Sequence, residues 1–173
     1  RVLDILSNAA ATIAEGEVLQ LTVAENTATT EDTYLKVIRG KTAALFSAAT
    51  EVGGVIAEQS DDVIKGLFDY GDALGIAFQM VDDLLDYGGT TGVIGKNVGD
   101  DFRERKLTLP VIRAIAAGGA ADHAFWERTI AKGDQRDGDL EEATTLMARH
   151  GTLESTAKTA LDYAERAKRA LAN

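Results

Sequence analysis

The sequence contains no cysteine and a single proline, Pro110. Without cysteine, neither a disulfide framework nor a thiolate metal site can form. Basic residues are scarce as well, with 18 lysines and arginines against 28 aspartates and glutamates and a formal charge of −10. Because nucleic-acid binders normally present a basic face, this balance disfavours nucleic acid as a partner. An anionic substrate would need local lysines or a metal ion to offset the acidic field.

Long apolar runs are also missing. No uninterrupted apolar segment is long enough to span a bilayer, and no signal peptide is found. The sequence therefore predicts a cytoplasmic protein without stable membrane insertion. Its 173 residues, 45% of them hydrophobic, are enough to build one real core, so residues 1–173 are expected to form a single domain.

Strand patterns are not found either, because no run of alternating β-branched residues is bracketed by hairpin turns. Abundant alanine and apolar periodicity instead favour an all-α fold, a helical bundle. Thr30 and Ser60 are plausible N-caps, and Pro110 suits the first turn of a helix. Helices are expected over residues 2–24, 31–58, 61–87, 110–118, 122–133, 138–151 and 152–173. The glycine-rich residues 88–100 predict a loop.

Three aspartates stand out near the end of the third expected helix. In FQMVDDLLDY, Asp82, Asp83 and Asp86 share a helical face, and Gln79 lies one turn earlier on the same stripe. Like charges at this spacing weaken a helix, by about 0.2–0.5 kcal/mol per pair, so something should compensate. Carboxylate oxygens suit Mg²⁺, which keeps open positions for substrate phosphates. A solvated acidic face is the alternative, and the flanking apolar residues weaken it.

Lysines occur on both sides of this acidic stretch. Lys96 and Lys106 lie in or after the glycine-rich loop, and either one alone could be an ordinary surface lysine. The loop is not a P-loop, because Asn97 follows the lysine and a helix, not a strand, precedes it. Lys41, followed by Thr42, sits inside the second expected helix. There it either reaches out to solvent or binds an anion.

Three segments in this order, RGKTAALFSAATEVGG, FQMVDDLLDY and GKNVGDDFRERKLTLP, resemble the later half of a trans-polyprenyl diphosphate synthase. The resemblance implies an all-helical prenyltransferase of the isoprenoid-synthase fold. GEVLQL near the start is also typical of the family, so the similarity covers essentially the whole chain. DDLLD matches the second aspartate-rich motif of the family, and no match to the first is found here. Arg105 replaces the glycine that usually precedes the second lysine.

The resemblance also implies residue roles. Asp82, with Asp83 and Asp86, would hold Mg²⁺. The diphosphate would be stabilised by three lysines, Lys41, Lys96 and Lys106. Thr42 and Gln79 would face the reacting allylic carbon. The implied substrates are isopentenyl diphosphate and an allylic diphosphate, and the implied assembly is a homodimer that packs through residues 2–20.

The details of RGKTAALFSAATEVGG are most similar to enzymes that make octaprenyl or decaprenyl diphosphate for a quinone tail. Two other classes stay open, a class I terpene cyclase and a non-catalytic diphosphate-binding subunit that regulates a prenyl synthase. Arg1 already falls inside an amphipathic helical pattern, which indicates either a trimmed start or the later part of a longer protein. Because only one aspartate motif is found, this chain alone is expected to be inactive.

Overall fold

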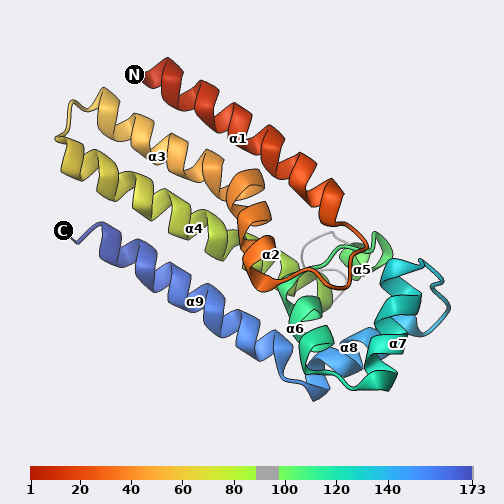
Figure 1. The fold of residues 1–173 in the computed structure, drawn as a ribbon. Coiled ribbons are helices and arrows are strands. Elements are labelled where there is room, and N and C mark those ends of the chain that lie inside the picture. The colour runs from red at the N-terminus through yellow and green to blue at the C-terminus, as the bar shows by residue number, and fades with distance from the viewer. Residues whose placement is uncertain (89–97, 173) are drawn as a thin grey trace. The chain divides into compact units, whose positions relative to one another are not determined.

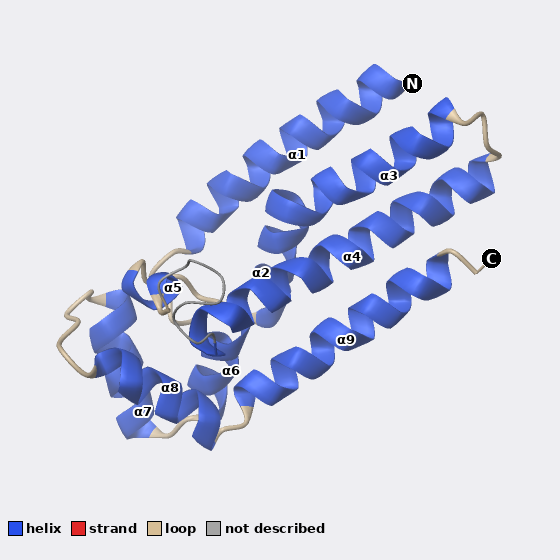
Figure 2. Ribbon diagram, turned by 180° about the vertical axis from the view of Figure 1, so that it is seen from behind, coloured by secondary structure: helices blue, strands red, loops and turns tan. Residues whose placement is uncertain are grey.

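A computed structural model describes residues 1–88 and 98–172 of the chain. All regular structure in this described part is helical, which confirms the all-α prediction (Figure 2). The helices are α1 (Val2–Val23), α2 (Glu31–Ile38), α3 (Ala44–Ile56), α4 (Asp61–Gly88), α5 (Asp100–Arg103), α6 (Leu109–Ala117), α7 (Ala120–Trp126), α8 (Asp139–Arg149) and α9 (Thr152–Ala170). Two π-helical segments, η1 (Arg39–Ala43) and η2 (Glu127–Ala131), follow α2 and α7.

Both expected N-caps are present. The backbone N–H of Thr33 donates to the hydroxyl of Thr30 at 3.2 Å, and the N–H of Val63 donates to the hydroxyl of Ser60 at 3.4 Å. Each bond satisfies one of the backbone donors that a helix leaves free in its first turn. Pro110 lies in the first turn of α6, as predicted. Among the described helices, none is both long and apolar enough to cross a membrane.

The structure divides into two compact units. The first contains residues 1–22, 35–79 and 159–173. Within it, α1, α3 and the corresponding parts of α4 and α9 lie side by side (Figures 1 and 2). Its buried residues are mostly small or β-branched, and include Val37, Ile38, Ala43, Ala48, Ile64, Ala73, Ile76, Ala77, Ala160 and Ala167.

The second unit contains residues 23–34 and 80–158. Its core is built around Trp126, which is fully buried. The apolar residues that pack with it come from the end of α4 and from α5 to α8: Tyr87, Phe102, Val111, Ala114, Ile115, Ile130, Ala143, Leu146 and Met147. This cluster anchors α5 through Phe102, the one buried residue of that short helix.

The second expected helix, residues 31–58, is interrupted by the π-helical segment η1. The interruption coincides with a close approach between α1 and η1. A methyl group on Gly16 would lie 2.5 Å from the backbone nitrogen of Lys41 and 2.7 Å from the carbonyl carbon of Gly40. On the side of α4, a methyl group on Gly75 would lie 2.5 Å from the Cα of Ala43. Glycines in α1 and α4 therefore allow the backbone that carries Lys41 to fit between these two helices.

Replacing Gly16 with alanine should destabilise the first unit. The added methyl group meets backbone atoms, which cannot move aside as a flexible side chain would, so a cost of about 1–3 kcal/mol is expected. Gly53→Ala is the matched control, because a methyl group there meets nothing within 4 Å. It should stabilise the helix by about 0.5–1 kcal/mol. Urea unfolding of both variants tests this, and equal midpoints for Gly16→Ala and wild type would contradict it.

Candidate active site

Lys41 is held by two side chains of α1. Its ammonium donates to the amide oxygen of Gln20 at 2.8 Å and lies 3.6 Å from a carboxylate oxygen of Glu17. The Lys41 side chain is 34% exposed, so the ammonium is accessible but fixed. The segment GEVLQL thus supplies Gly16 for the close approach and Glu17 and Gln20 for the lysine. In the sequence, this motif is recognisable only by its family resemblance, and the contacts that it makes leave no local pattern.

Thr42 and Gln79 are brought together as a pair. The Thr42 hydroxyl donates to the Gln79 amide oxygen at 2.8 Å, linking η1 to α4 across 37 residues of sequence. Both side chains are half-buried. The hydroxyl oxygen keeps its lone pairs, so this pair presents oxygen atoms that can face developing positive charge. The structure therefore groups Lys41, Thr42 and Gln79 in the first unit.

Asp83 is buried in the second unit. Its carboxylate accepts a hydrogen bond from the Tyr34 hydroxyl at 2.7 Å, and both residues are only 4% exposed. Burial, together with the negative charge of Asp83, raises the pKa of Tyr34, so the phenol stays protonated and remains a donor. Tyr34 was not singled out in the sequence, because a lone tyrosine in a short amphipathic helix gives no signal of a polar partner.

Asp86 binds the start of α5. One carboxylate oxygen accepts the backbone N–H of Asp100 at 3.1 Å and the other accepts that of Asp101 at 3.0 Å. Burial, followed by the nearby charge of Asp101, raises the pKa of Asp86. This carboxylate is therefore in a position where additional positive charge would be favourable. A four-residue helix has too little periodicity to be predicted from sequence, which explains why α5 was missed.

Lys106 follows α5 and pairs with two carboxylates. Its ammonium lies 2.9 Å from Asp101 and 2.7 Å from Glu104. Burial of the ammonium opposes the shift, but the hydrogen bonds to Glu104 and Asp101 raise the pKa of Lys106, so the lysine is charged. The structure thus places Lys106 near acidic residues of the second unit. Lys96 lies outside the described residues.

The three aspartates do not form a metal cage by themselves. In the described part of the chain, no group of three or more acidic or histidine side chains is close enough to hold an ion. Asp83 and Asp86 instead make the contacts given above, and Asp82 is half-buried. Mg²⁺ commonly uses only one or two protein carboxylates and takes its other ligands from water and substrate phosphates. A donor set of carboxylates with one raised pKa fits such an ion.

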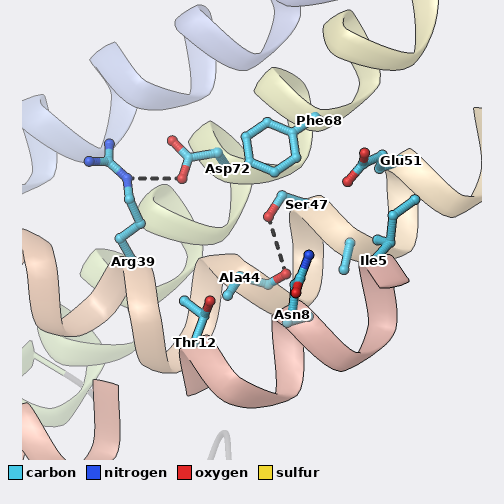
Figure 3. Close-up of a pocket in the computed structure, with 11 residues that line it drawn as sticks. Ile5, Asn8, Thr12, Arg39, Ala44, Ser47, Glu51, Phe68 and Asp72 are labelled. Atoms are coloured by element: carbon cyan, nitrogen blue, oxygen red, sulfur yellow. Dashed lines mark hydrogen bonds and ion pairs between the residues drawn. The ribbon is translucent and has the colours of Figure 1, made fainter. Parts of the chain in front are cut away.

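A separate cavity of about 310 Å³ lies in the first unit (Figure 3). Figure 3 shows Ile5, Asn8 and Thr12 of α1 on one side and Phe68 and Asp72 of α4 on another. The small residues Ala44, Ser47 and Ala48 of α3 complete the lining and leave the space open. Arg39 donates to Asp72 at 2.9 Å within this lining.

Removing the Tyr34 hydroxyl should destabilise the second unit. Tyr34→Phe takes a hydrogen bond from a buried carboxylate, which costs about 1–3 kcal/mol. Tyr163→Phe, in the half-exposed part of α9, makes the same chemical change without touching Asp83 and should cost less than about 0.5 kcal/mol. Urea unfolding measures both. Equal losses in the two variants would show that the Tyr34 hydrogen bond contributes nothing specific.

The chain is similar to known proteins. The family model described as Polyprenyl synthetase matches residues 1–147. Octaprenyl diphosphate synthase from Escherichia coli (strain K12) is 43% identical over 171 residues, covering 99% of this chain and 53% of that protein. The chain spans about half the length of such relatives.

Solved structures show the same fold. A decaprenyl diphosphate synthase from Rhodobacter capsulatus superposes with a TM-score of 0.95 at 67% identity, covering 100% of this chain and 53% of that one. A polyprenyl synthase from Caulobacter crescentus CB15, complexed with calcium and isoprenyl diphosphate, gives a TM-score of 0.95 at 48% identity over 99% of this chain and 52% of that one. The chain belongs to the polyprenyl synthetase family.

Proposed function

We propose that this chain is part of a prenyltransferase that condenses an allylic diphosphate with isopentenyl diphosphate to give a polyprenyl diphosphate. The observation that carries the proposal is α4, a single helix that bears Gln79, hydrogen-bonded to Thr42, and continues into Asp82, Asp83 and Asp86. Such a helix offers oxygen atoms that can face a positively charged allylic carbon, and carboxylates that can bind a metal ion. The family match over residues 1–147 supports the same activity.

The difficult step in this reaction is departure of the diphosphate. The bond between the allylic carbon and the diphosphate oxygen breaks, and its electron pair leaves with pyrophosphate. The double bond of isopentenyl diphosphate then forms the new carbon–carbon bond, and a proton is lost. Lys41 and Lys106 are charged donors that can stabilise the leaving anion, while Thr42 and Gln79 can face the cationic carbon. Lys96 is proposed for the same anion.

Mg²⁺ is the proposed cofactor, and when bound it would neutralise charge on the departing diphosphate. Asp82, Asp83 and Asp86 are the residues proposed to hold it. The related Caulobacter crescentus enzyme was crystallised with calcium and isoprenyl diphosphate, which supports a divalent cation together with a diphosphate. Asp83 and Asp86 are already oriented by Tyr34 and α5, so these carboxylates need little reorganisation to accept an ion.

The product is proposed to be a long prenyl chain, as the names of the octaprenyl and decaprenyl relatives suggest. Its proposed use in a quinone side chain rests on the resemblance of RGKTAALFSAATEVGG. A homodimer is proposed as well. Leu3, Leu6 and Val18 of α1 are 80%, 45% and 60% exposed, which gives this helix an apolar outer surface. Ile13 and Leu19 of the same helix are half-buried and contribute less to it. A cytoplasmic location stays a prediction.

Magnesium binding should depend on pyrophosphate and on Asp82. We expect titration calorimetry to show weak binding of Mg²⁺ alone and tighter binding with pyrophosphate present, because phosphate oxygens complete the coordination sphere. Asp82→Asn should weaken binding about 10-fold to 100-fold by removing a ligand charge. Asp82 is the residue of choice, because Asp83 and Asp86 make contacts whose loss would also disturb the fold.

Asp62→Asn is the matched control, since Asp62 is an exposed aspartate in the first turn of the same helix. It should bind Mg²⁺ and pyrophosphate as the wild type does. Equal affinities in the Asp82 and Asp62 variants would show that the aspartates of FQMVDDLLDY are only a solvated acidic face and bind no metal ion.

Residues 1–173 alone should not catalyse prenyl transfer. A leaving diphosphate needs positive charge on more than one side, and only one aspartate-rich motif is found in the sequence. Loss of a single preorganised electrostatic contact typically costs about 10²–10³ in rate, so loss of a metal-binding wall should abolish turnover. The assay compares incorporation of labelled isopentenyl diphosphate by this chain and by its relative, the octaprenyl diphosphate synthase of Escherichia coli. Robust turnover by this chain would require a second metal site within it.

A further inference from the structure

Arg105 adopts a backbone conformation that favours glycine. Its φ angle is 57°, in the left-handed region. The N–H of Arg105 donates to the carbonyl of Phe102 at 3.0 Å, and the N–H of Lys106 donates to that of Asp101 at 2.9 Å. This pair of bonds is a Schellman motif that ends α5, and glycine is the usual residue at the position of Arg105. A side chain here is strained, so its own contacts should offset the strain.

The Arg105 side chain makes two such contacts. Its guanidinium forms an ion pair of 2.5 Å with Glu25, which lies in the connection between α1 and α2. It also lies against Gly133, where an added methyl group would come within 2.8 Å of Nη1 of Arg105. Glu25 is itself left-handed, with φ 66°. Two of the three non-glycine residues with positive φ in the described part are therefore the partners of one ion pair.

The adjoining residue is Lys106, the lysine proposed above to bind the diphosphate. We propose that the Arg105–Glu25 ion pair is a tether that holds the end of α5 against the α1–α2 connection and so positions Lys106 for the diphosphate. Arg105 is a positioning residue in this proposal and does not touch the ligand. The inference rests on the proposed function of Lys106.

Glycine at residue 105 would give the same backbone turn without strain, but it would have no side chain with which to bind Glu25. A segment without the tether would have to become ordered when the diphosphate binds, and that ordering lowers affinity. Arg105 therefore strains the local backbone, but its ion pair holds Lys106 in place. All the residues that make these contacts belong to the second unit.

The test is titration of the protein with inorganic pyrophosphate in the presence of Mg²⁺. Arg105→Gly and Glu25→Gln should each weaken binding about threefold to tenfold, the cost of ordering a freed segment. The thermal midpoint of Arg105→Gly should not fall, because relief of backbone strain offsets the lost ion pair. Exchanging the two charges, Glu25→Arg with Arg105→Glu, should restore the affinity.

Two further variants separate positioning from charge and from a general effect on structure. Arg103→Ala removes an exposed arginine from α5 without touching Glu25 and should leave the affinity within about twofold. In a Lys106→Gln background, Arg105→Gly should have no additional effect, because the residue that it positions is gone.

Unchanged affinity in Arg105→Gly, or an equal loss with and without Lys106, would overturn the tether. If Lys106→Gln binds pyrophosphate as tightly as wild type, Lys106 is not part of the diphosphate site, and the tether then has no residue to position. The Asp82 titration would still test the metal site by itself.

Discussion

α1 and η1 approach each other closely at Gly16 and Gly40. The positions of Lys41 and Thr42 depend on this close approach. Without side chains at these two positions, the backbone of Lys41 can lie against α1. There Glu17, next to the crossing, and Gln20, one turn further along, reach its ammonium. The π-helical turn at η1 adds to this by changing the register of the helix at Lys41 and Thr42. π-Helical turns are frequent at functional sites.

At the acidic end of α4, hydrogen-bond donors orient the carboxylates. Asp83 and Asp86 would repel each other and any diphosphate, but one is bound by a phenol that stays protonated and the other by two backbone N–H groups. These donors fix the carboxylates without neutralising them. The orientation of each carboxylate is therefore already determined, which lowers the reorganisation needed to bind a cation.

Periodicity and turn chemistry were enough to predict most of the helices. The bounds of α1, α4 and α8 differ from the predicted ranges by at most a few residues, and Thr30 and Ser60 cap as expected. The π-helical segment was not predictable. In the sequence Gly40 is only a residue that weakens a helix, and its close approach to Gly16 is seen only in the structure. Partners such as Tyr34 and Gln20 were missed for a similar reason. Hydrogen bonds across 49 and 21 residues of sequence leave no local pattern.

The two described lysines of the proposed site already face carboxylates, Lys41 near Glu17 and Lys106 beside Asp101 and Glu104. In a chain of charge −10, such pairing keeps cations in an otherwise acidic region. A diphosphate must therefore compete with these carboxylates for the lysines, and a divalent cation that offsets the acidic charge would ease that competition. By thermodynamic linkage, the diphosphate must then strengthen cation binding by the same factor. In the proposed site, the acidic partners of the lysines would thus make metal and diphosphate each favour the binding of the other.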